Sequence, residues 1–460
     1  MLKNNVNMLS GPIIPGLLKM SIPIMVMQIA QALFNIADMA ILKVFDSSGI
    51  AVGAVGTCTI LISLFTVMAV GISSGSNVVI ARHIGSSEQD SVERSVGTSL
   101  VLAVLSGALL FAAGFFLTDW LLSLVNCPTE FLKQSVLYLK VSFISLPFVV
   151  LYNFSAAILR ATGDTGRPMI YLIISGAVKV AATYIFSGPL KMGVLGVALS
   201  TVISWAVAAA LTFFALLREK GVVKINPRRL KIYKRELLEI LFIGLPAAAQ
   251  PIFFTVANLM LTATVNSFGA AASTSYSIGS TFENIIYQMA VASSLAIMPY
   301  VSQNVGNRNI KRARQAVRGG ILITVVLICF FGWLSALLSR QLASMMSDDP
   351  TVIALARQKM ILVSTPYFIY GISEVLCAAM RGLGRPIVAA LTSLTHMCVI
   401  RIFWIYVIFP LHPELWFLYL IWPIGWVLVT LTILCFYFPT VKKLKQKIER
   451  KDVSEQIPTA

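Results

Sequence analysis

Five charged side chains stand out within the long apolar runs of this sequence. They are Asp38, Lys179, Glu283, Glu374 and Arg401. A charged group within a membrane-spanning helix is costly, so it usually faces a protein interior or a wet cavity and marks an ion or substrate pathway. Carboxylates in such places can exchange a proton or bind an inorganic or organic cation. We therefore treat each of the five as a candidate functional residue.

Polar side chains precede Asp38 along one face of the first apolar run. Gln28, Gln31, Asn35 and Asp38 are separated by steps of three, four and three residues, which place them on one side of a helix. Lipid cannot satisfy these amides, so the stripe should face a protein interior or a wet cavity. Desolvation there penalises the ionised form of Asp38, which suits a proton-coupling group. The alternative is a carboxylate that only joins two helices by a hydrogen bond.

A second polar set lies in the later half of the chain. Glu374 shares a helical face with Tyr367 and Tyr370. One interpretation is an acid-base cluster that binds the coupling ion or an organic cation, with the tyrosine rings adding cation-π contacts. The other is a buried pair of Glu283 with Arg401 that joins helices. The residues themselves leave both interpretations open.

Helices that cross a membrane must position these residues. Hydrophobic residues make up 57% of the 460-residue chain and charged residues 12%, which is more apolar surface than a soluble fold can bury. Apolar runs of about 20 residues recur, the length that crosses a bilayer as a helix, and they lack the period-two alternation of a β-barrel. We expect an all-α polytopic membrane protein with about twelve transmembrane helices in the lipid bilayer. The expected spans are 17–42, 53–81, 96–117, 134–159, 168–188, 193–217, 238–266, 275–303, 316–338, 355–380, 386–410 and 415–440.

The net charge of +17 resides in the loops between apolar runs and not on one soluble face. We therefore expect no nucleic-acid partner. Basic residues cluster in alternate loops, so the positive-inside rule predicts that both termini are cytoplasmic. The six cysteines and three histidines show no metal-ligand or catalytic spacing. No cofactor and no enzymatic activity are expected.

The two halves of the chain repeat each other. Pro23 and Pro246 are separated by 223 residues, and so are Asn35 and Asn258. Each copy holds six expected helices, so an axis along the membrane normal should relate the copies and a cleft should lie between two bundles. The expected domains are an N-terminal lobe over residues 1–217, a cytoplasmic basic linker over 218–237, a C-terminal lobe over 238–441 and a basic cytoplasmic tail over 442–460.

Four segments in this order resemble one known family. They read SIPIMVMQIAQALFNIADMAIL, ARHIGSSEQDSVERSV, LRATGDTGRP and GVLGVALSTVISW, and weaker echoes follow in the second half. Over essentially the whole chain the sequence resembles the multidrug and toxic compound extrusion (MATE) transporters, closest to the bacterial DinF/MepA-like branch. The resemblance implies a twelve-helix antiporter of the bacterial plasma (inner) membrane. Such a protein would export small organic, often cationic, compounds against the entry of protons or sodium ions, and we expect a monomer.

The resemblance also implies roles for particular residues. The coupling carboxylate on the first helix of the family follows a kinking proline at the spacing seen from Pro23 to Asp38. Where members place an Asn and an Asp on the fifth helix, this chain has Lys179 and Thr183, and the lysine can pair with Asp38. Glu374 matches the tenth-helix acid of sodium-coupled members, so a sodium ion there and a proton are both candidates. The candidate ion-coupling or substrate-binding residues are Asp38, Asn35, Gln31, Gln28, Lys179, Thr183, Glu283, Glu374, Tyr367, Tyr370, Asn258 and Arg401.

Two other transport classes compete with this interpretation. A flippase for lipids or lipid-linked glycans, from the same broad superfamily, would usually carry about two more helices and a basic central cavity. The chain length and the acidic stripe argue against it. A channel would need a filter-like repeat, which the sequence lacks.

Overall fold

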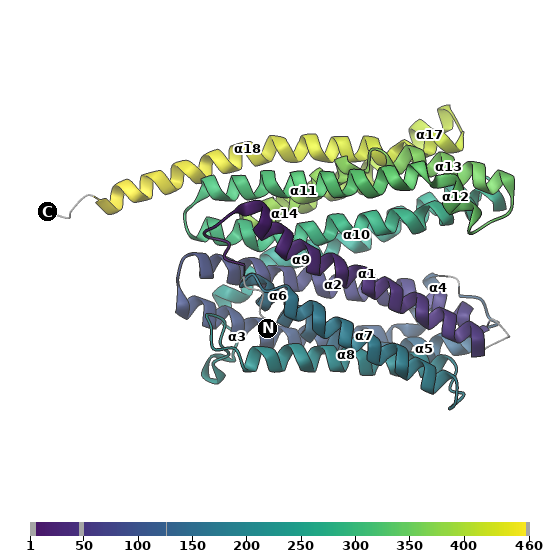
Figure 1. Ribbon diagram of the computed structural model, residues 1–460, viewed down its shortest axis with the longest axis horizontal. Coiled ribbons are helices and arrows are strands. Elements are labelled where there is room, and N and C mark those ends of the chain that lie inside the picture. Colours follow the sequence, from purple (N-terminus) through teal and green to yellow (C-terminus); the bar gives the residue numbers. More distant parts are fainter. Residues whose placement is uncertain (1–5, 46–49, 126, 457–460) are drawn as a thin grey trace. The chain divides into compact units, whose positions relative to one another are not determined.

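The chain is helical throughout the part that the structure describes. This computed structural model describes residues 6–45, 50–125 and 127–456 (Figure 1). Ten of the described helices are long and apolar enough to cross a membrane, and two bent pairs bring the number to as many as twelve. The prediction of about twelve spans in an all-α protein is confirmed. Of the expected tail over 442–460, residues 457–460 lie outside the described residues.

The first repeat contributes eight α-helices. They are α1 (Ile13–Phe45), α2 (Ile50–Gly85), α3 (Gln89–Phe116), α4 (Thr118–Leu124), α5 (Leu132–Phe143), α6 (Leu146–Ala161), α7 (Gly166–Ser187) and α8 (Val194–Leu217). The pair α5 and α6 is one of the bent spans, with an angle of 41°. Pro147 stands in the first turn of α6, where proline is compatible with a helix but does not let it continue from the preceding residues.

The second repeat has the same order with more interruptions. Its elements are η1 (Pro227–Arg229), α9 (Lys234–Asn266), α10 (Ala270–Gly306), α11 (Ile310–Leu337), α12 (Ser339–Ser344), α13 (Pro350–Ser364), α14 (Tyr367–Gly382), α15 (Pro386–Leu394), η2 (Thr395–Val399), α16 (Ile400–Phe403), η3 (Trp404–Ile408), η4 (Phe409–Leu411), α17 (Leu415–Tyr419) and α18 (Ile421–Gln456). The pair α13 and α14 is bent by 42° at Pro366. The segments η2 and η3 are π-helical, whereas η1 and η4 are 3₁₀ turns.

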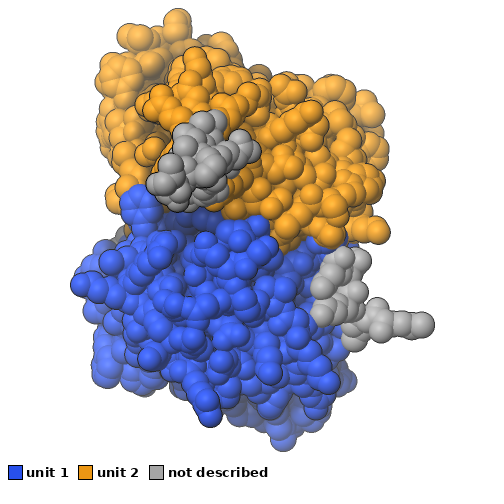
Figure 2. Space-filling model, turned by 90° about the vertical axis from the view of Figure 1, so that its left-hand side faces the viewer, with its two compact units in different colours: residues 1–6, 26–249 blue, residues 7–25, 250–460 orange. Residues whose placement is uncertain are grey.

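The described chain forms two compact units, coloured blue and orange in Figure 2. Unit 1 lies within residues 1–6 and 26–249, and unit 2 within 7–25 and 250–460. The chain therefore changes unit inside α1 and again inside α9, near the repeat-equivalent Pro23 and Pro246. Each unit includes the start of the first helix of the other repeat. The expected domain borders around the linker lie inside unit 1.

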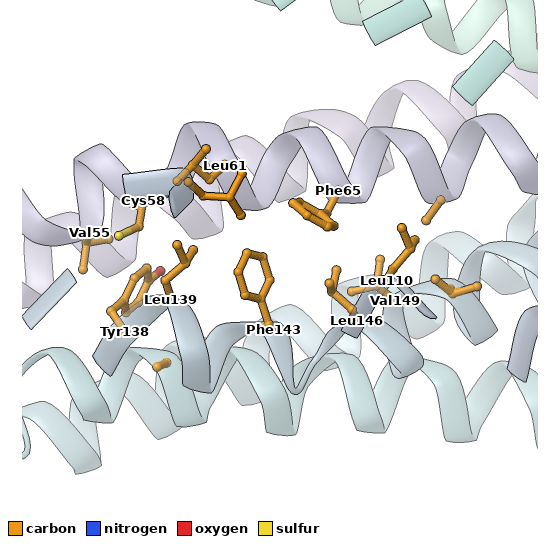
Figure 3. Packing of buried hydrophobic residues seen from close by; sticks show 14 of the residues in the cluster. Val55, Cys58, Leu61, Phe65, Leu110, Tyr138, Leu139, Phe143, Leu146 and Val149 are labelled. Atoms are coloured by element: carbon orange, nitrogen blue, oxygen red, sulfur yellow. The ribbon is translucent and has the colours of Figure 1, made fainter. Parts of the chain in front are cut away.

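The core of unit 1 lies between α2, α5 and α6 (Figure 3). The rings of Phe65 and Phe143 face each other there, with centroids 5.0 Å apart. Small residues hold α9 close to α2, because a Cβ on Gly75 would lie 2.1 Å from the carbonyl oxygen of Ile240. Close approach through glycine is a common way to pack helices in membranes, where van der Waals contact replaces the hydrophobic effect.

The start of α1 is anchored in unit 2 by an arginine of α11. The guanidinium of Arg312 donates to the carbonyl oxygens of Met8 at 2.9 Å, Ser10 at 2.7 Å and Gly11 at 2.9 Å. The Asn304 amide donates to Met8 as well, at 3.0 Å. These bonds satisfy carbonyls that precede the helix and have no partner within it.

The equivalent segment before α9 is anchored in unit 1. The backbone N–H of Tyr233 donates to the hydroxyl of Thr98 on α3 at 3.2 Å, and that hydroxyl donates to the Lys231 carbonyl at 3.4 Å. A Cβ on Gly97 would lie 2.0 Å from the carbonyl oxygen of Arg229. The two repeats therefore share one pattern. The segment before α1 is held by α11 of the second repeat, and the segment before α9 is held by α3 of the first repeat.

Candidate functional site

A buried ion pair joins α1 and α7 in unit 1. The ammonium of Lys179 lies 2.6 Å from Oδ2 of Asp38, and it donates to the side-chain oxygen Oδ1 of Asn35 at 3.2 Å. The hydroxyl of Thr183 donates to Oδ1 of Asp38 at 2.9 Å and lies 2.6 Å from the hydroxyl of Ser200 on α8. Asp38 is 5% exposed. The sequence-predicted Asp38, Asn35, Lys179 and Thr183 therefore form one network.

Local packing explains why α7 reaches this carboxylate. A Cβ on Gly176 would lie 1.8 Å from the ring of Phe34, so only a glycine lets α7 approach α1 here. Lys179 follows that glycine by three residues and Asp38 follows Phe34 by four, which places both side chains near the point of close approach. Gln28 and Gln31 stand two to three turns earlier on α1 and are half-buried.

A second buried ion pair lies in unit 2, and its basic partner was not predicted. Glu283 on α10 pairs with Lys359 on α13 at 3.0 Å, and Lys359 is fully buried. The lysine also donates to the Ser280 hydroxyl at 2.7 Å and lies 4.2 Å from the ring centroid of Tyr276. Within the described residues the predicted pair of Glu283 with Arg401 does not form. That interpretation is wrong, because Lys359 of the bent α13 takes the place beside Glu283 on α10.

Arg401 instead repeats the contact of Lys179. Its Nη1 donates to the side-chain oxygen of Asn258 at 2.5 Å, and Asn258 occupies the place that Asn35 has in the first repeat. Arg401 is 8% exposed and lies 5.5 Å from the ring centroid of Trp422. In this part of unit 2 the rings of Tyr276 and Trp422 lie against the chain's own basic side chains. The predicted cation-π contacts of Tyr367 and Tyr370 with a bound cation stay a prediction.

A second polar group of unit 2 surrounds Glu374 on α14. Ser294 donates to Oε1 of Glu374 at 3.1 Å, and Arg381 lies 3.8 Å from the same oxygen. Arg381 also donates to the Gln250 side chain at 2.9 Å. A cavity of about 30 Å³ beside these groups is lined by Glu374, Gln250 and Tyr370, among others. It has room for one or two water molecules or a small ion.

The predicted face of α14 is only partly realised. Tyr370 lines the same cavity as Glu374. Tyr367 packs its ring against the tilted ring of Trp426 with centroids 4.6 Å apart and belongs to the apolar core of unit 2. Among the described residues no group of three or more His, Cys, Asp or Glu side chains could hold a metal ion. A cation at Glu374 would therefore depend on neutral oxygens for its other ligands.

Two basic residues of these groups were not among the sequence-predicted candidates. Lys359 lies within the expected span 355–380, so treating every charge inside a span as a candidate would have found it. Arg381 stands in a glycine-rich turn, where an arginine is typical of the cytoplasmic end of a span. Its contact with Glu374 was detectable only as a spacing of seven residues, two helical turns, on one helix.

The fold and these buried ion pairs together define a class of protein. A helical membrane protein made of two repeated halves, with paired charges inside its spans, has the construction of a secondary transporter. The MatE family model matches residues 23–185 and 246–407. The chain therefore belongs to the MatE family, as its motifs predicted.

Named relatives and solved structures agree with this assignment. The chain is 27% identical to the probable multidrug resistance protein YoeA of Bacillus subtilis, over 73% of this chain and 74% of the relative. It is 24% identical to an FAD transporter of Shewanella oneidensis, over 87% of this chain and 89% of the relative. A crystal structure of a MATE protein in complex with MaL6 has the same fold, with a TM-score of 0.89 at 19% identity, over 96% of this chain and 99% of that one.

Proposed function

We propose that this protein is a secondary active antiporter that exports small organic compounds in exchange for protons or sodium ions. Membership of the MatE family supports transport and the absence of an enzymatic role. The observation that carries the coupling part is the network of Asp38, Lys179, Thr183 and Asn35, which places a titratable carboxylate between two helices of unit 1. A lipid or glycan flippase is not favoured.

Through this network a proton on Asp38 would change the contact between α1 and α7. Protonation of Asp38 would remove the negative charge that faces Lys179, so the ion pair between α1 and α7 would be lost while the contact of Lys179 with Asn35 could persist. Removing one charge of a buried pair changes the free energy of the folded conformation by about 3–5 kcal/mol. This is large enough to shift a conformational equilibrium almost completely.

The neighbours of the carboxylate favour a proton over sodium in unit 1. The ammonium of Lys179, at 2.6 Å from Asp38, stands where a bound monovalent cation would lie. A sodium ion would have to displace a tethered cation, whereas a proton needs only an oxygen lone pair. A sodium ion at Glu374 is the second candidate for coupling. The small cavity there and the neutral oxygens of Gln250, Ser373 and Ser393 support it.

A transport assay tests the role of Asp38. In proteoliposomes with a proton gradient, Asp38→Asn should abolish efflux of a fluorescent drug at unchanged reconstitution. The matched control is Asp119→Asn, because Asp119 is 72% exposed and its contact with Lys140, at 3.7 Å, lies at the surface. Full efflux by Asp38→Asn would rule out the coupling role. A sodium gradient applied separately would show which ion drives the export.

Further properties are proposed on the same basis. The protein is placed as a monomer in the bacterial plasma (inner) membrane, crossing it many times, with both termini in the cytoplasm. Cationic substrates, which the family resemblance implies, would bind near Glu374 and the ring of Tyr370 only in a conformation in which the cavity of about 30 Å³ has widened. That binding requires Arg381 to release Glu374. One relative is named as an FAD transporter and another as a probable multidrug resistance protein, so the names of the relatives give no single substrate class.

A further inference from the structure

Two buried basic side chains of unit 2 flank one aromatic ring. The ammonium of Lys359 lies 5.8 Å from the ring centroid of Trp422, and the guanidinium carbon of Arg401 lies 5.5 Å from it. Lys359 is fully buried and Arg401 is 8% exposed. One carboxylate, Glu283, belongs to this group, and it pairs with Lys359 at 3.0 Å. The group therefore carries an excess of one positive charge when all three are ionised.

The excess resides on Arg401. Among the described residues Arg401 forms no ion pair with an acidic side chain, and Asn258 supplies only a neutral amide oxygen. The other acid inside a span of unit 2, Glu374, is the partner of Arg381. An isolated buried cation is unfavourable by several kcal/mol unless a negative charge compensates it.

Comparison of the repeats shows which group is missing. In the first repeat Lys179 contacts both Asn35 and the carboxylate of Asp38. In the second repeat Arg401 contacts Asn258, but the position of Asp38 is taken by Leu261, which is fully buried in the core. The cation and the amide are retained without the internal counter-ion.

The local backbone adds a second observation. Arg401 lies in the short helix α16 between the π-helical segments η2 and η3. Such wide turns are rare and are frequent at functional sites. The guanidinium carries five N–H donors in a planar fork, of which the bond to Asn258 uses one. The remaining donors match the two oxygens of a carboxylate.

We propose that Arg401, Asn258 and Trp422 form a binding site for a monovalent anionic group, the carboxylate of an aromatic organic compound. The inference rests on the proposed export function and names a substrate class distinct from the cations proposed for Glu374. The guanidinium would bind the carboxylate, and the rings of Trp422 and Tyr276, with centroids 6.3 Å apart, would contact the aromatic body. Chloride has the same charge and is the inorganic alternative for this site.

A matched pair of ligands tests the proposal. The probes are a fluorescent aromatic carboxylic acid and its methyl ester, which share the ring system and differ in the negative charge. Their dissociation constants would be measured with the full-length protein in nanodiscs. The wild type should bind the acid about tenfold more tightly than the ester, the size of one charge-assisted hydrogen bond.

Three variants assign the preference to Arg401. Arg401→Gln should bring the acid-to-ester ratio close to one while leaving ester binding almost unchanged, which also shows that the variant is folded. Arg401→Lys keeps the charge and should retain part of the preference. Arg340→Gln removes an exposed arginine and should behave as the wild type. An acid preference that is absent from the wild type, or unchanged in Arg401→Gln, would overturn the proposal.

Two further arms separate the remaining outcomes. If chloride weakens acid binding competitively relative to gluconate, the site is an anion site that an inorganic ion shares, and the proposal is supported. Efflux from proteoliposomes distinguishes the proposal from the function on which it rests. Export of the ester with no preference for the acid would overturn the anion site alone, whereas an acid preference in binding without any driven export would overturn the antiporter.

Discussion

Replacing Lys359 by methionine tests whether the charges inside unit 2 are held as a pair. Lys359→Met keeps an unbranched side chain of similar length, whose stem can still pack at Gly279, where a Cβ would lie 2.9 Å from Cδ of Lys359. It removes the ion pair with Glu283 at 3.0 Å and the bond to Ser280 at 2.7 Å. The variant therefore leaves a carboxylate buried with no cation beside it.

The magnitude follows from that unpaired charge. Breaking a buried ion pair by removing one partner costs about 3–5 kcal/mol. We include the loss of the bond to Ser280 in this figure. The double variant Lys359→Met with Glu283→Gln removes both charges of this pair and leaves Arg401 unchanged. We expect it to be destabilised by only about 1–2 kcal/mol, less than the single lysine variant, because its polar groups are neutral.

Unfolding in mixed detergent micelles with increasing SDS measures these differences. The exposed pair of Lys445 with Glu449, at 3.5 Å on the last helix, provides the control. Lys445→Met should change the free energy of unfolding by less than about 0.5 kcal/mol. The reasoning would be refuted if the double variant were destabilised as much as the sum of the two single variants.

Two further predictions concern packing and orientation. Gly75→Ala should strongly lower the thermal stability of the purified protein, because the added Cβ would lie 2.1 Å from the Ile240 carbonyl oxygen. The control is Gly56→Ala on the same helix, whose Cβ meets only the end of Met39 at 3.9 Å and should be tolerated. Equal stability of the two variants would contradict the close contact of α2 with α9. Single cysteines placed at residues 10 and 445 of a cysteine-free protein should both react with an impermeant maleimide only after the cells are opened, and reaction at either site in intact cells would contradict cytoplasmic termini.

The number and positions of the spans were predictable because apolar length decides them. The span expected at 168–188 is close to the observed α7 (Gly166–Ser187), and 193–217 is close to α8 (Val194–Leu217). Hydropathy carries no information about bends, although Pro366 marked the one between α13 and α14. The change of unit inside α1 was not predictable. An apolar helix fits many neighbours, and the choice depends on polar anchors such as Arg312.

The candidate site was predictable where its polar residues follow a regular spacing along one helix. The stripe that ends at Asp38, and the family resemblance that sets Lys179 on the fifth helix, both pointed to their contact. The partner of Glu283 was not predictable, because Lys359 and Arg401 both lie in spans that could reach α10 and only their packing decides between them. Spacing along the sequence orders the residues of one helix, but it does not order the helices around it.

Each repeat holds a basic side chain against an asparagine, Lys179 with Asn35 and Arg401 with Asn258, and the repeats differ in the acid beside them. In unit 1 the acid is part of the chain, so the cation of Lys179 is neutralised in place and the group can change state by gaining a proton. In unit 2 Leu261 stands at that position, so neutralisation of Arg401 requires a charge from outside the chain. Under the two proposals above, this one difference separates a proton-exchanging first repeat from an anion-binding second repeat. A variant Leu261→Asp should therefore supply the missing counter-ion and compete with the carboxylate ligand, lowering the acid-to-ester binding ratio as Arg401→Gln does. If Leu261→Asp folded and left the ratio unchanged, Arg401 would not be the group that the ligand neutralises.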